Sequence, residues 1–358
     1  MGRLTSFVAL FFVAAPLLSS ARADWPERPI NMVVMYAPGG GTDTVLRALA
    51  TEMSRSTGWV INVTNRTGAS GALATRYVLN KRPDGYTILG ASNFNKYARI
   101  VGGVDTRPWA DWYFMQAAYG IGSWSVRPDS PFQSFQDLME TARQESNELT
   151  ISTSGAGGQV HEMAAIIAQV AGLNLKYVPY AGGQVATLAG LNGEVDIAGG
   201  GVHEHIRLID SGDLVPLMQT GTTDIVTTTG KVIPTVSNFV PQIRDRLPLN
   251  GPYTIGVLRD TPIEVIRAIE EAFFTAVQSS AFEEIVRQRN IFVDVMVGEN
   301  ADRRAAELEV ITATIFEELG IPGARTTEEL GLPETKDFDR WWPHQTMHRL
   351  PVIRSLLQ

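Results

Sequence analysis

Apolar segments and glycine-rich turns alternate along the first part of the chain in an order typical of a βαβαβ unit. A short apolar strand ends at Tyr36. The glycine-rich turn 37–41 then leads into an amphipathic helix with apolar residues at Val45, Leu46, Leu49 and Met53. A strand at 59–63, a helix to about Leu79 and a strand at 86–89 follow. The pattern therefore predicts three strands joined by two helices.

The same order returns in the middle of the chain. A strand at 149–153 precedes the turn 154–158 and a helix, and a strand at 175–178, a helix to about Leu191 and a strand at 195–198 follow. Right-handed crossovers place such turns at the carboxyl ends of parallel strands, where open α/β sheets bind ligands. We therefore expect an α/β fold of two lobes, each a parallel-rich sheet flanked by helices, with a ligand cleft between them.

Further elements follow the second unit. Residues 261–264 (Thr-Pro-Ile-Glu) have the pattern of a capping box with proline at the first helical position, which predicts a helix to about Val277. A strand at 291–297 and a helix from Asn300 to about Leu319 complete the expected elements.

Composition indicates an exported globular protein. A length of 358 residues supports roughly two domains. Arg3, the apolar run 7–18 and the Ala-Arg-Ala sequence at 21–23 are typical of a secretory signal peptide over residues 1–23. No later stretch is long and apolar enough to predict stable insertion in a membrane, and there is no cysteine for a disulfide or a lipid anchor. We expect a soluble protein in a bacterial periplasm.

Net charge restricts the partners. The formal charge is −8, and loss of Arg3 and Arg22 with the signal peptide makes the mature chain −10, so nucleic acid is not an expected partner. An acidic protein repels anions over long range. Any bound anion must therefore be held by local backbone N–H groups and helix dipoles, which the glycine turns supply.

Catalytic and metal motifs are missing. The first turn lacks the lysine of a phosphate-binding loop, and Thr44 and Val160 stand where G-x-G-x-x-G needs its third glycine. Ser154 is not set in G-x-S-x-G, and residues 203–205 (His-Glu-His) do not form H-E-x-x-H. We expect no enzyme activity, no metal and no cofactor, and a structural or solvent-facing role for His203.

Six segments together resemble one known family. The chain is similar, from about Trp25 to Ile321, to the Bug-type (TctC-like) substrate-binding proteins of tripartite tricarboxylate transporters. The matching segments are 25–30 (WPERPI), 36–43 (YAPGGGTD), 65–71 (NRTGASG), 83–89 (PDGYTIL), 178–183 (VPYAGG) and 193–196 (GEVD). The resemblance implies a two-lobed periplasmic binding protein fold, type II-like, that closes on a small carboxylated solute. It also implies delivery to membrane subunits of a transporter, and a sensor kinase is an alternative partner.

The resemblance also implies lobe boundaries. The first lobe comprises 24–124 and 252–321, and the second comprises 125–251. Residues 322–358 form a C-terminal extension beyond the family's usual end. Its apolar residues predict packing on the first lobe, on a dimer partner or on the transporter, without ligand contacts; they are Trp341, Trp342, Leu350, Val352, Ile353, Leu356 and Leu357.

Backbone N–H groups at helix starts form the predicted anion site. Gly40, Gly41 and Thr42, with the Thr42 hydroxyl, hold one end of a carboxylate, and the second turn meets it from the other lobe through Thr153, Ser154, Gly157 and Gly158. His161, on the first turn of its helix, either donates a hydrogen bond to the ligand or lies on the helix surface. Asp43 is expected to bond N–H groups of its own helix or to orient a bridging water.

Aromatic residues near the turns have two readings. Tyr36, Phe94 and Trp124 either pack in the core and hinge or shape selectivity. The complete set of candidate ligand-binding residues is Tyr36, Gly39, Gly40, Gly41, Thr42, Asp43, Ser92, Asn93, Thr153, Ser154, Gly155, Gly157, Gly158, His161, Tyr180, Gly182, Gly183 and Glu204.

The sequence thus predicts a solute receptor without catalysis. The alternative is a sensor or scaffold protein of the cell envelope that uses the cleft for signalling, and a cofactor-free hydrolase is a more distant one. An aliphatic dicarboxylate, an aromatic carboxylate and an amino acid all stay open as ligands.

Overall fold

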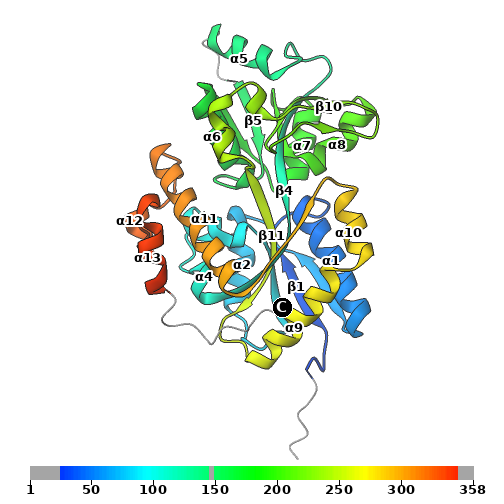
Figure 1. Ribbon diagram of the computed structural model, residues 1–358, viewed down its shortest axis with the longest axis vertical. Coiled ribbons are helices and arrows are strands. Elements are labelled where there is room, and N and C mark those ends of the chain that lie inside the picture. The colour runs from blue at the N-terminus through cyan, green and yellow to red at the C-terminus, as the bar shows by residue number, and fades with distance from the viewer. Residues whose placement is uncertain (1–24, 145–148, 346–358) are drawn as a thin grey trace, which may run out of the picture.

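Two long strands connect an upper and a lower group of elements in the computed structural model, which describes residues 25–144 and 149–345 (Figure 1). Strand β4 (Trp112–Val126) pairs along its first part with β11 (Asn250–Leu258), antiparallel, and along its last residues with β7 (Ala198–Gly201) and β8 (Val215–Gln219). One sheet therefore runs through both lobes. The expected signal peptide, 1–23, lies outside the described residues.

The first lobe has the expected βαβαβ order. Strand β1 (Ile30–Val34) lies between β2 (Ile61–Asn65) and β3 (Thr87–Ser92), parallel to both, with α1 (Gly41–Thr57) and α2 (Ala72–Leu79) as the crossovers. Strand β11 then pairs with β3 antiparallel, so the sheet order is β12-β4-β11-β3-β1-β2. Parallel pairing brings the ends of β1 and β3 to the same edge.

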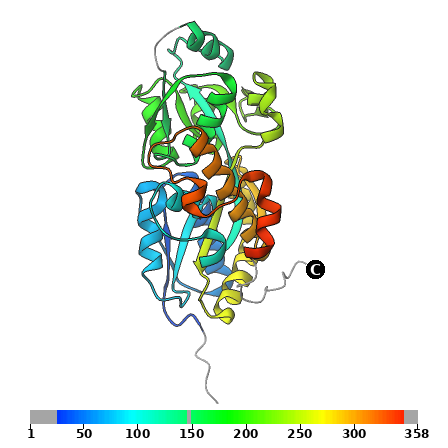
Figure 2. The same ribbon diagram turned by 90° about the vertical axis from the view of Figure 1, so that its left-hand side faces the viewer.

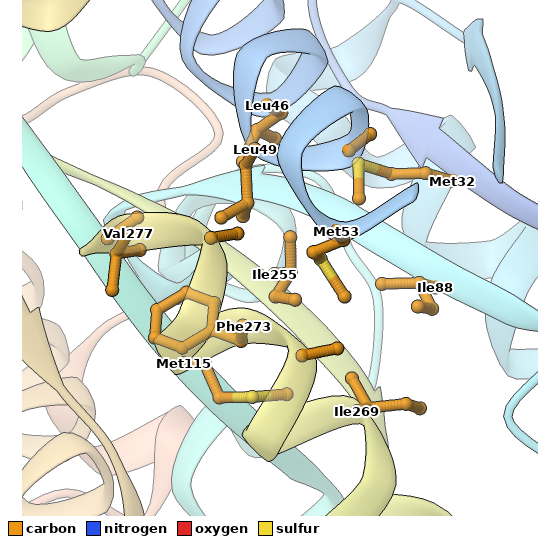
Figure 3. Close-up of a cluster of buried hydrophobic side chains, with 14 of the residues drawn as sticks. Met32, Leu46, Leu49, Met53, Ile88, Met115, Ile255, Ile269, Phe273 and Val277 are labelled. Carbon is orange, nitrogen blue, oxygen red and sulfur yellow. The ribbon is translucent and has the colours of Figure 1, made fainter. Parts of the chain in front are cut away.

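A methionine- and isoleucine-rich core covers one face of this sheet (Figure 3). Leu46, Leu49 and Met53 recur at helical spacing on α1, and helix α9 (Ile263–Val277) packs beside α1 through a matching apolar face. Both helices bury these side chains against the strands; the labelled residues are Met32, Leu46, Leu49, Met53, Ile88, Met115, Ile255, Ile269, Phe273 and Val277.

The expected capping box of α9 is wrong. Pro262 itself occupies the N-cap position, no side chain caps the helix, and the Thr261 hydroxyl is buried without a partner among the described residues. Proline at the N-cap places the helix start one residue later than the pattern indicated.

The second lobe repeats the first only in part. Strands β5 (Leu149–Thr153) and β6 (Leu175–Pro179) are parallel and are joined by α6 (Gln159–Ala171), and α7 (Gly183–Leu191) follows. The third strand was expected at 195–198, yet only Ile197 bridges to β5 in parallel, and the chain then pairs with β4 as β7. Glycine allows this close passage, since a Cβ on Gly199 would lie 2.2 Å from the Ser152 carbonyl oxygen.

Helix α11 (Gly298–Glu318) covers the other face of the first-lobe sheet. The other elements are α3 (Lys96–Ile100), α4 (Pro108–Asp111), α5 (Phe135–Gln144), α8 (Val202–Ser211), α10 (Ser280–Arg287), β9 (Ile225–Val226), β10 (Val232–Ile233), β12 (Phe292–Met296), and the 3₁₀ turns Ala69–Gly71, Asn93–Asn95, Val236–Asn238 and Pro241–Arg246. Within the described ranges, no helix combines the length and the hydrophobicity that a membrane span requires.

The C-terminal segment packs on the first lobe beside α11 (Figure 2). It comprises α12 (Thr327–Leu330), a 3₁₀ turn at Thr335–Asp337 and α13 (Phe338–Gln345). Trp342 is buried, and the ring of Trp341 contacts that of Trp109 edge-on at 5.6 Å. The expected packing of both tryptophans is confirmed; Leu350, Val352, Ile353, Leu356 and Leu357 lie outside the described residues.

Candidate functional site

A cleft lies between the lobes, beside the β4 and β11 connections. Its first-lobe and hinge lining consists of Tyr36, Ala37, Gly40, Gly41, Thr42, Ile121, Gly122 and Tyr253, and its second-lobe lining of Ser154, Gln159, Val160, Met163, Gly182, Gly183, Gln184, Gly200, Gly201, His203 and Glu204. The remaining free volume is about 40 Å³. The lobes are therefore closed on one another in this conformation.

Direct contacts between the lobes maintain this closure. Ser70 Oγ donates to the Ala156 carbonyl oxygen at 2.6 Å, and Asn93 Nδ2 donates to Gln159 Oε1 at 3.0 Å. Ser92 and Asn93 were expected at the ligand. The structure places Ser92 at the end of β3 and Asn93 at the start of the following 3₁₀ turn, both outside the cleft lining, and Asn93 contacts the opposite lobe instead.

The first glycine turn opens directly onto the cleft. Gly40 is the N-cap of α1 and no side chain caps this helix, so the positive end of its dipole faces the space between the lobes. Gly41 packs so tightly that a Cβ there would lie 2.2 Å from His203 Nε2 and 2.3 Å from the Tyr253 hydroxyl. The sequence folds this way because only glycine lets the second lobe approach the start of α1.

Asp43 is turned away from the cleft. Its carboxylate accepts from the Gly39 amide at 3.0 Å, from Arg47 Nε at 2.9 Å and from Asn65 Nδ2 at 2.8 Å. Burial raises the pKa of Asp43, but these three hydrogen bonds outweigh burial and hold the pKa below its ordinary value. The ionised side chain thus fixes the shape of the turn. Neither Asp43 nor Gly39 lines the cleft.

The second glycine turn uses several of its own groups internally. The Gly157 amide donates to His161 Nδ1 at 2.9 Å, and the Gly158 amide donates to the Gly155 carbonyl at 3.1 Å. Ser154 lines the cleft, and its hydroxyl accepts from the Val160 amide at 3.4 Å. Thr153, Gly157 and Gly158 lie behind this surface, outside the lining.

His161 does not line the cleft; its ring packs near Tyr177 of the second lobe and near Phe316 of α11, whose ring centroid is 6.3 Å away. The His161 ring lies 4.3 Å from that of Tyr177, and its side chain is buried. Burial lowers the pKa of His161 to about 4, so the ring is neutral at pH 7. Its Nε2 has no hydrogen-bond partner among the described residues.

A second, neighbouring cavity of about 300 Å³ includes other predicted residues. Gly155 and Tyr180 line it, and it shares Tyr36 and Ser154 with the cleft. Gly182 and Gly183 line the cleft itself. Of the aromatic residues, Phe94 and Trp124 are buried in the cores of the two lobes.

The first turn of α8 brings two side chains to the cleft. Glu204 Oε2 accepts from the Gly201 amide at 2.8 Å, and Glu204 Oε1 lies 3.6 Å from His203 Nε2, which is 3.4 Å from the Tyr253 hydroxyl. The expectation of a structural or solvent-facing role misses the place of His203 in the cleft. The signal was present as a third glycine run, 199–201, directly before a helix.

Tyr253, Gln159 and Met163 also line the cleft and were not expected there. Tyr253 comes from the returning strand β11, whose position against the second lobe no local pattern indicates. Within the described ranges, no group of three or more His, Cys, Asp or Glu side chains is arranged to hold a metal ion.

Comparison with known proteins places this architecture. A curated relative, the UPF0065 protein in the gbd 5' region of Cupriavidus necator, is 24% identical over 330 residues, which cover 90% of this chain and 97% of the relative. The periplasmic binding protein BugD has a TM-score of 0.74 at 23% identity, covering 83% of this chain and 99% of BugD. Rpa4515 of Rhodopseudomonas palustris, solved with adipate, has a TM-score of 0.71 at 23% identity, covering 87% of this chain and 100% of Rpa4515.

The family model described as "Tripartite tricarboxylate transporter family receptor" matches residues 45–321. This match contains the second lobe, α1 from residue 45 onward, and all of the helices α9 and α11. The expected two-lobed α/β binding fold is confirmed, and receptors of this kind are binding proteins rather than enzymes. Because the match spans most of the length of this chain, the chain belongs to the family of tripartite tricarboxylate transporter receptors.

Proposed function

We propose that this protein is a periplasmic receptor that closes its lobes on a small carboxylated solute and delivers it to membrane subunits of a tripartite tricarboxylate transporter. Family membership supports the receptor role, and the similar protein Rpa4515 was solved with a dicarboxylate, adipate. We assign 24–124 and 252–321 to the first lobe and 125–251 to the second, with the crossings in β4 and β11.

One observation carries the proposal. The N-terminus of α1 opens onto the interlobe cleft at Gly40 and Gly41 without a capping side chain, and the second lobe covers it. A carboxylate at this point accepts hydrogen bonds from backbone N–H groups and lies at the positive end of the helix dipole. Closure removes water from these hydrogen bonds, which strengthens charge-assisted bonding. The long-range repulsion of an acidic chain is thereby offset locally.

A small number of contacts is enough for micromolar binding. A micromolar dissociation constant corresponds to about 8 kcal/mol, and four or more charge-assisted hydrogen bonds of about 1.5–3 kcal/mol each can supply it after desolvation. Opening and closing of the lobes about β4 and β11 gives the solute a way in and out.

A ligand screen tests the proposal. The mature protein is unfolded and refolded to remove carried solute, and its melting temperature is measured with aliphatic, aromatic and amino acid carboxylates, adipate included. A carboxylate that binds the folded protein raises the melting temperature. Its methyl ester should bind much more weakly, because it lacks the charge that the helix dipole attracts. A folded protein that responds to no carboxylate contradicts the proposal.

Export and delivery are tested separately. We propose that the mature protein starts at Asp24 in the periplasm, which N-terminal sequencing of the exported protein checks. Loss of solute uptake after deletion of the gene separates delivery from the alternative sensor or scaffold role, in which uptake is unchanged.

A further inference from the structure

A buried carboxylate lies in the cleft that we propose binds an anion. Glu204 is 8% exposed, and its side chain enters the space between the lobes from the first turn of α8. It is the one acidic residue in the lining, and this lining contains no lysine or arginine. The cleft therefore joins an anion-attracting helix start to a built-in negative charge.

Glycines from both lobes make room for this carboxylate. A Cβ on Gly183 would lie 2.2 Å from Glu204 Oε2, one on Gly200 would lie 3.1 Å from Oε2, and one on Gly40 would lie 3.5 Å from Oε1. The carboxylate thus reaches the point where the first-lobe turn meets two second-lobe loops. Any solute bound at Gly40 lies within the immediate field of Glu204.

The surrounding groups keep Glu204 ionised. Burial raises its pKa, but His203, the Gly201 amide and His205 outweigh burial and lower the pKa below its ordinary value. Arg207 and Arg289 are also nearby; burial and the charge of Arg207 lower the pKa of Arg289, and Glu204 only partly opposes this shift. Arg207 is exposed and Arg289 is half-buried, and neither lines the cleft.

One oxygen of Glu204 can accept a further hydrogen bond. Oε2 accepts from Gly201, whereas Oε1 lies 3.6 Å from His203 Nε2, beyond normal hydrogen-bond distance. A solute that carries only carboxylates would bring a second anion toward Oε1 in a closed, desolvated space, which is unfavourable. A solute with an ammonium group would instead form a charge-assisted hydrogen bond there.

We propose that the preferred solute is zwitterionic, with a carboxylate held at the start of α1 and an ammonium group held by Glu204 Oε1. This inference rests on the proposed function and narrows the solute class to amino carboxylates. Glu204 is then a specificity-determining residue, because it stabilises a bound ammonium group and repels the equivalent solute that carries only carboxylates.

Matched pairs of solutes test this inference. Calorimetry on refolded protein compares L-aspartate with succinate, L-glutamate with glutarate, and 6-aminohexanoate with hexanoate and adipate. We expect at least one amino carboxylate to bind tenfold or more tightly than its partner without the amino group. In Glu204→Gln, which keeps the shape and an oxygen for the Gly201 amide, we expect that solute to lose tenfold or more in affinity and its partner to gain affinity.

The gain in affinity of Glu204→Gln for the solute without an amino group is the decisive readout, because a misfolded variant cannot show it. Glu140→Gln, an exposed acid on α5 of the same lobe, is the matched control and should leave both affinities unchanged. If wild type binds succinate, glutarate or adipate as tightly as any amino carboxylate, the inference is wrong while the proposed function stands. If the folded protein binds no carboxylate of either kind, both are wrong.

Discussion

Lys96 Nζ lies 3.1 Å from Glu162 Oε2, and the two residues come from different lobes. Lys96 is 2% exposed on α3, and Glu162 is buried on the first turn of α6. Thr312 of α11 donates to Glu162 Oε1 at 2.5 Å, and the Tyr97 hydroxyl also donates to Glu162. Burial lowers the pKa of Lys96, although Glu162 opposes this shift. The pair therefore connects the lobes close to the cleft in the closed form.

Removing one partner of this pair should destabilise the closed protein. Lys96→Met leaves Glu162 buried without its cation, and such changes cost about 3–5 kcal/mol. We expect a loss of this order in the free energy of unfolding by urea, together with weaker carboxylate binding because the closed form is disfavoured.

The exposed pair Arg287–Glu284, at 2.7 Å, is the control. Arg287→Met should change the free energy of unfolding by less than about 1 kcal/mol. Equal effects of the two substitutions would show that Lys96 does not act through a buried pair.

Two adjacent glycines separate the effect of cleft geometry from that of helix stability. Gly41→Ala places a Cβ 2.2 Å from His203 Nε2 of the second lobe and 2.3 Å from the Tyr253 hydroxyl, so both side chains must move and closure over the start of α1 is hindered. Gly40→Ala meets its nearest neighbour at 3.5 Å, and the φ of Gly40, −72°, suits alanine. We expect Gly41→Ala to lose at least a hundredfold in affinity for any carboxylate that binds wild type, and Gly40→Ala to lose much less.

Calorimetry with the same solute on both variants measures this difference, and circular dichroism checks that each is folded. Equal affinity of Gly41→Ala and wild type would place the ligand elsewhere.

Acid should weaken the fold partly through His161. Its pKa is about 4 in the folded protein, against an ordinary value of 6.5. Between these values the unfolded chain binds a proton that the folded protein does not. The contribution of neutral His161 to the free energy of unfolding is therefore fully present above pH 6.5 and falls as the pH drops toward 4. His161→Phe keeps the ring contact with Tyr177 but cannot titrate.

Urea unfolding at pH 7, 6, 5 and 4 checks this prediction. Over this pH range, the free energy of unfolding of wild type should fall by about 1–3 kcal/mol more than that of His161→Phe. His205, whose pKa is also about 4 and which both proteins keep, leaves a remaining slope in the variant. Parallel pH profiles for the two proteins would show that His161 titrates normally.

The sequence predicts well those features that local periodicity encodes. The strands β1, β3, β5 and β6 and the crossover helices follow from apolar spacing and from glycines at the turns. The pairing of β7 with β4 was not predicted, because a run of three glycines has no periodicity and its partner lies about 75 residues earlier in the chain.

The candidate site shows the same division. Gly40, Gly41 and Thr42 were expected from the turn and line the cleft, whereas His203 and Tyr253 reach it through the closure of one lobe on the other. Contacts such as Lys96 with Glu162, 66 positions apart, depend on tertiary packing that no window of the sequence contains. The sequence predicts that Asp43 bonds N–H groups of its own helix or orients a water, whereas the structure shows Arg47 and Asn65 donating to its carboxylate, contacts that no local pattern indicates.

The C-terminal segment should contribute stability without contacting the ligand. Trp342 of α13 is 4% exposed and stacks on Phe338, with ring centroids 6.0 Å apart, in the core beneath α11. Arg99 Nη2 also donates to the Leu330 carbonyl at 2.6 Å, which fixes the start of this segment to α3. None of these residues lines the cleft.

We therefore expect Trp342→Ala to lower the free energy of unfolding by about 3–5 kcal/mol, the usual cost of removing a buried tryptophan. Arg340→Ala, on the exposed side of α13, should change the free energy of unfolding by no more than about 0.5 kcal/mol.

Deletion of 326–358 should likewise destabilise the protein and lower its melting temperature. In both Trp342→Ala and the deletion, ligand affinity should stay within about threefold, or roughly 0.6 kcal/mol. Unchanged stability after deletion would show that the segment is dispensable, whereas a large loss of affinity in a folded variant would place it at the cleft.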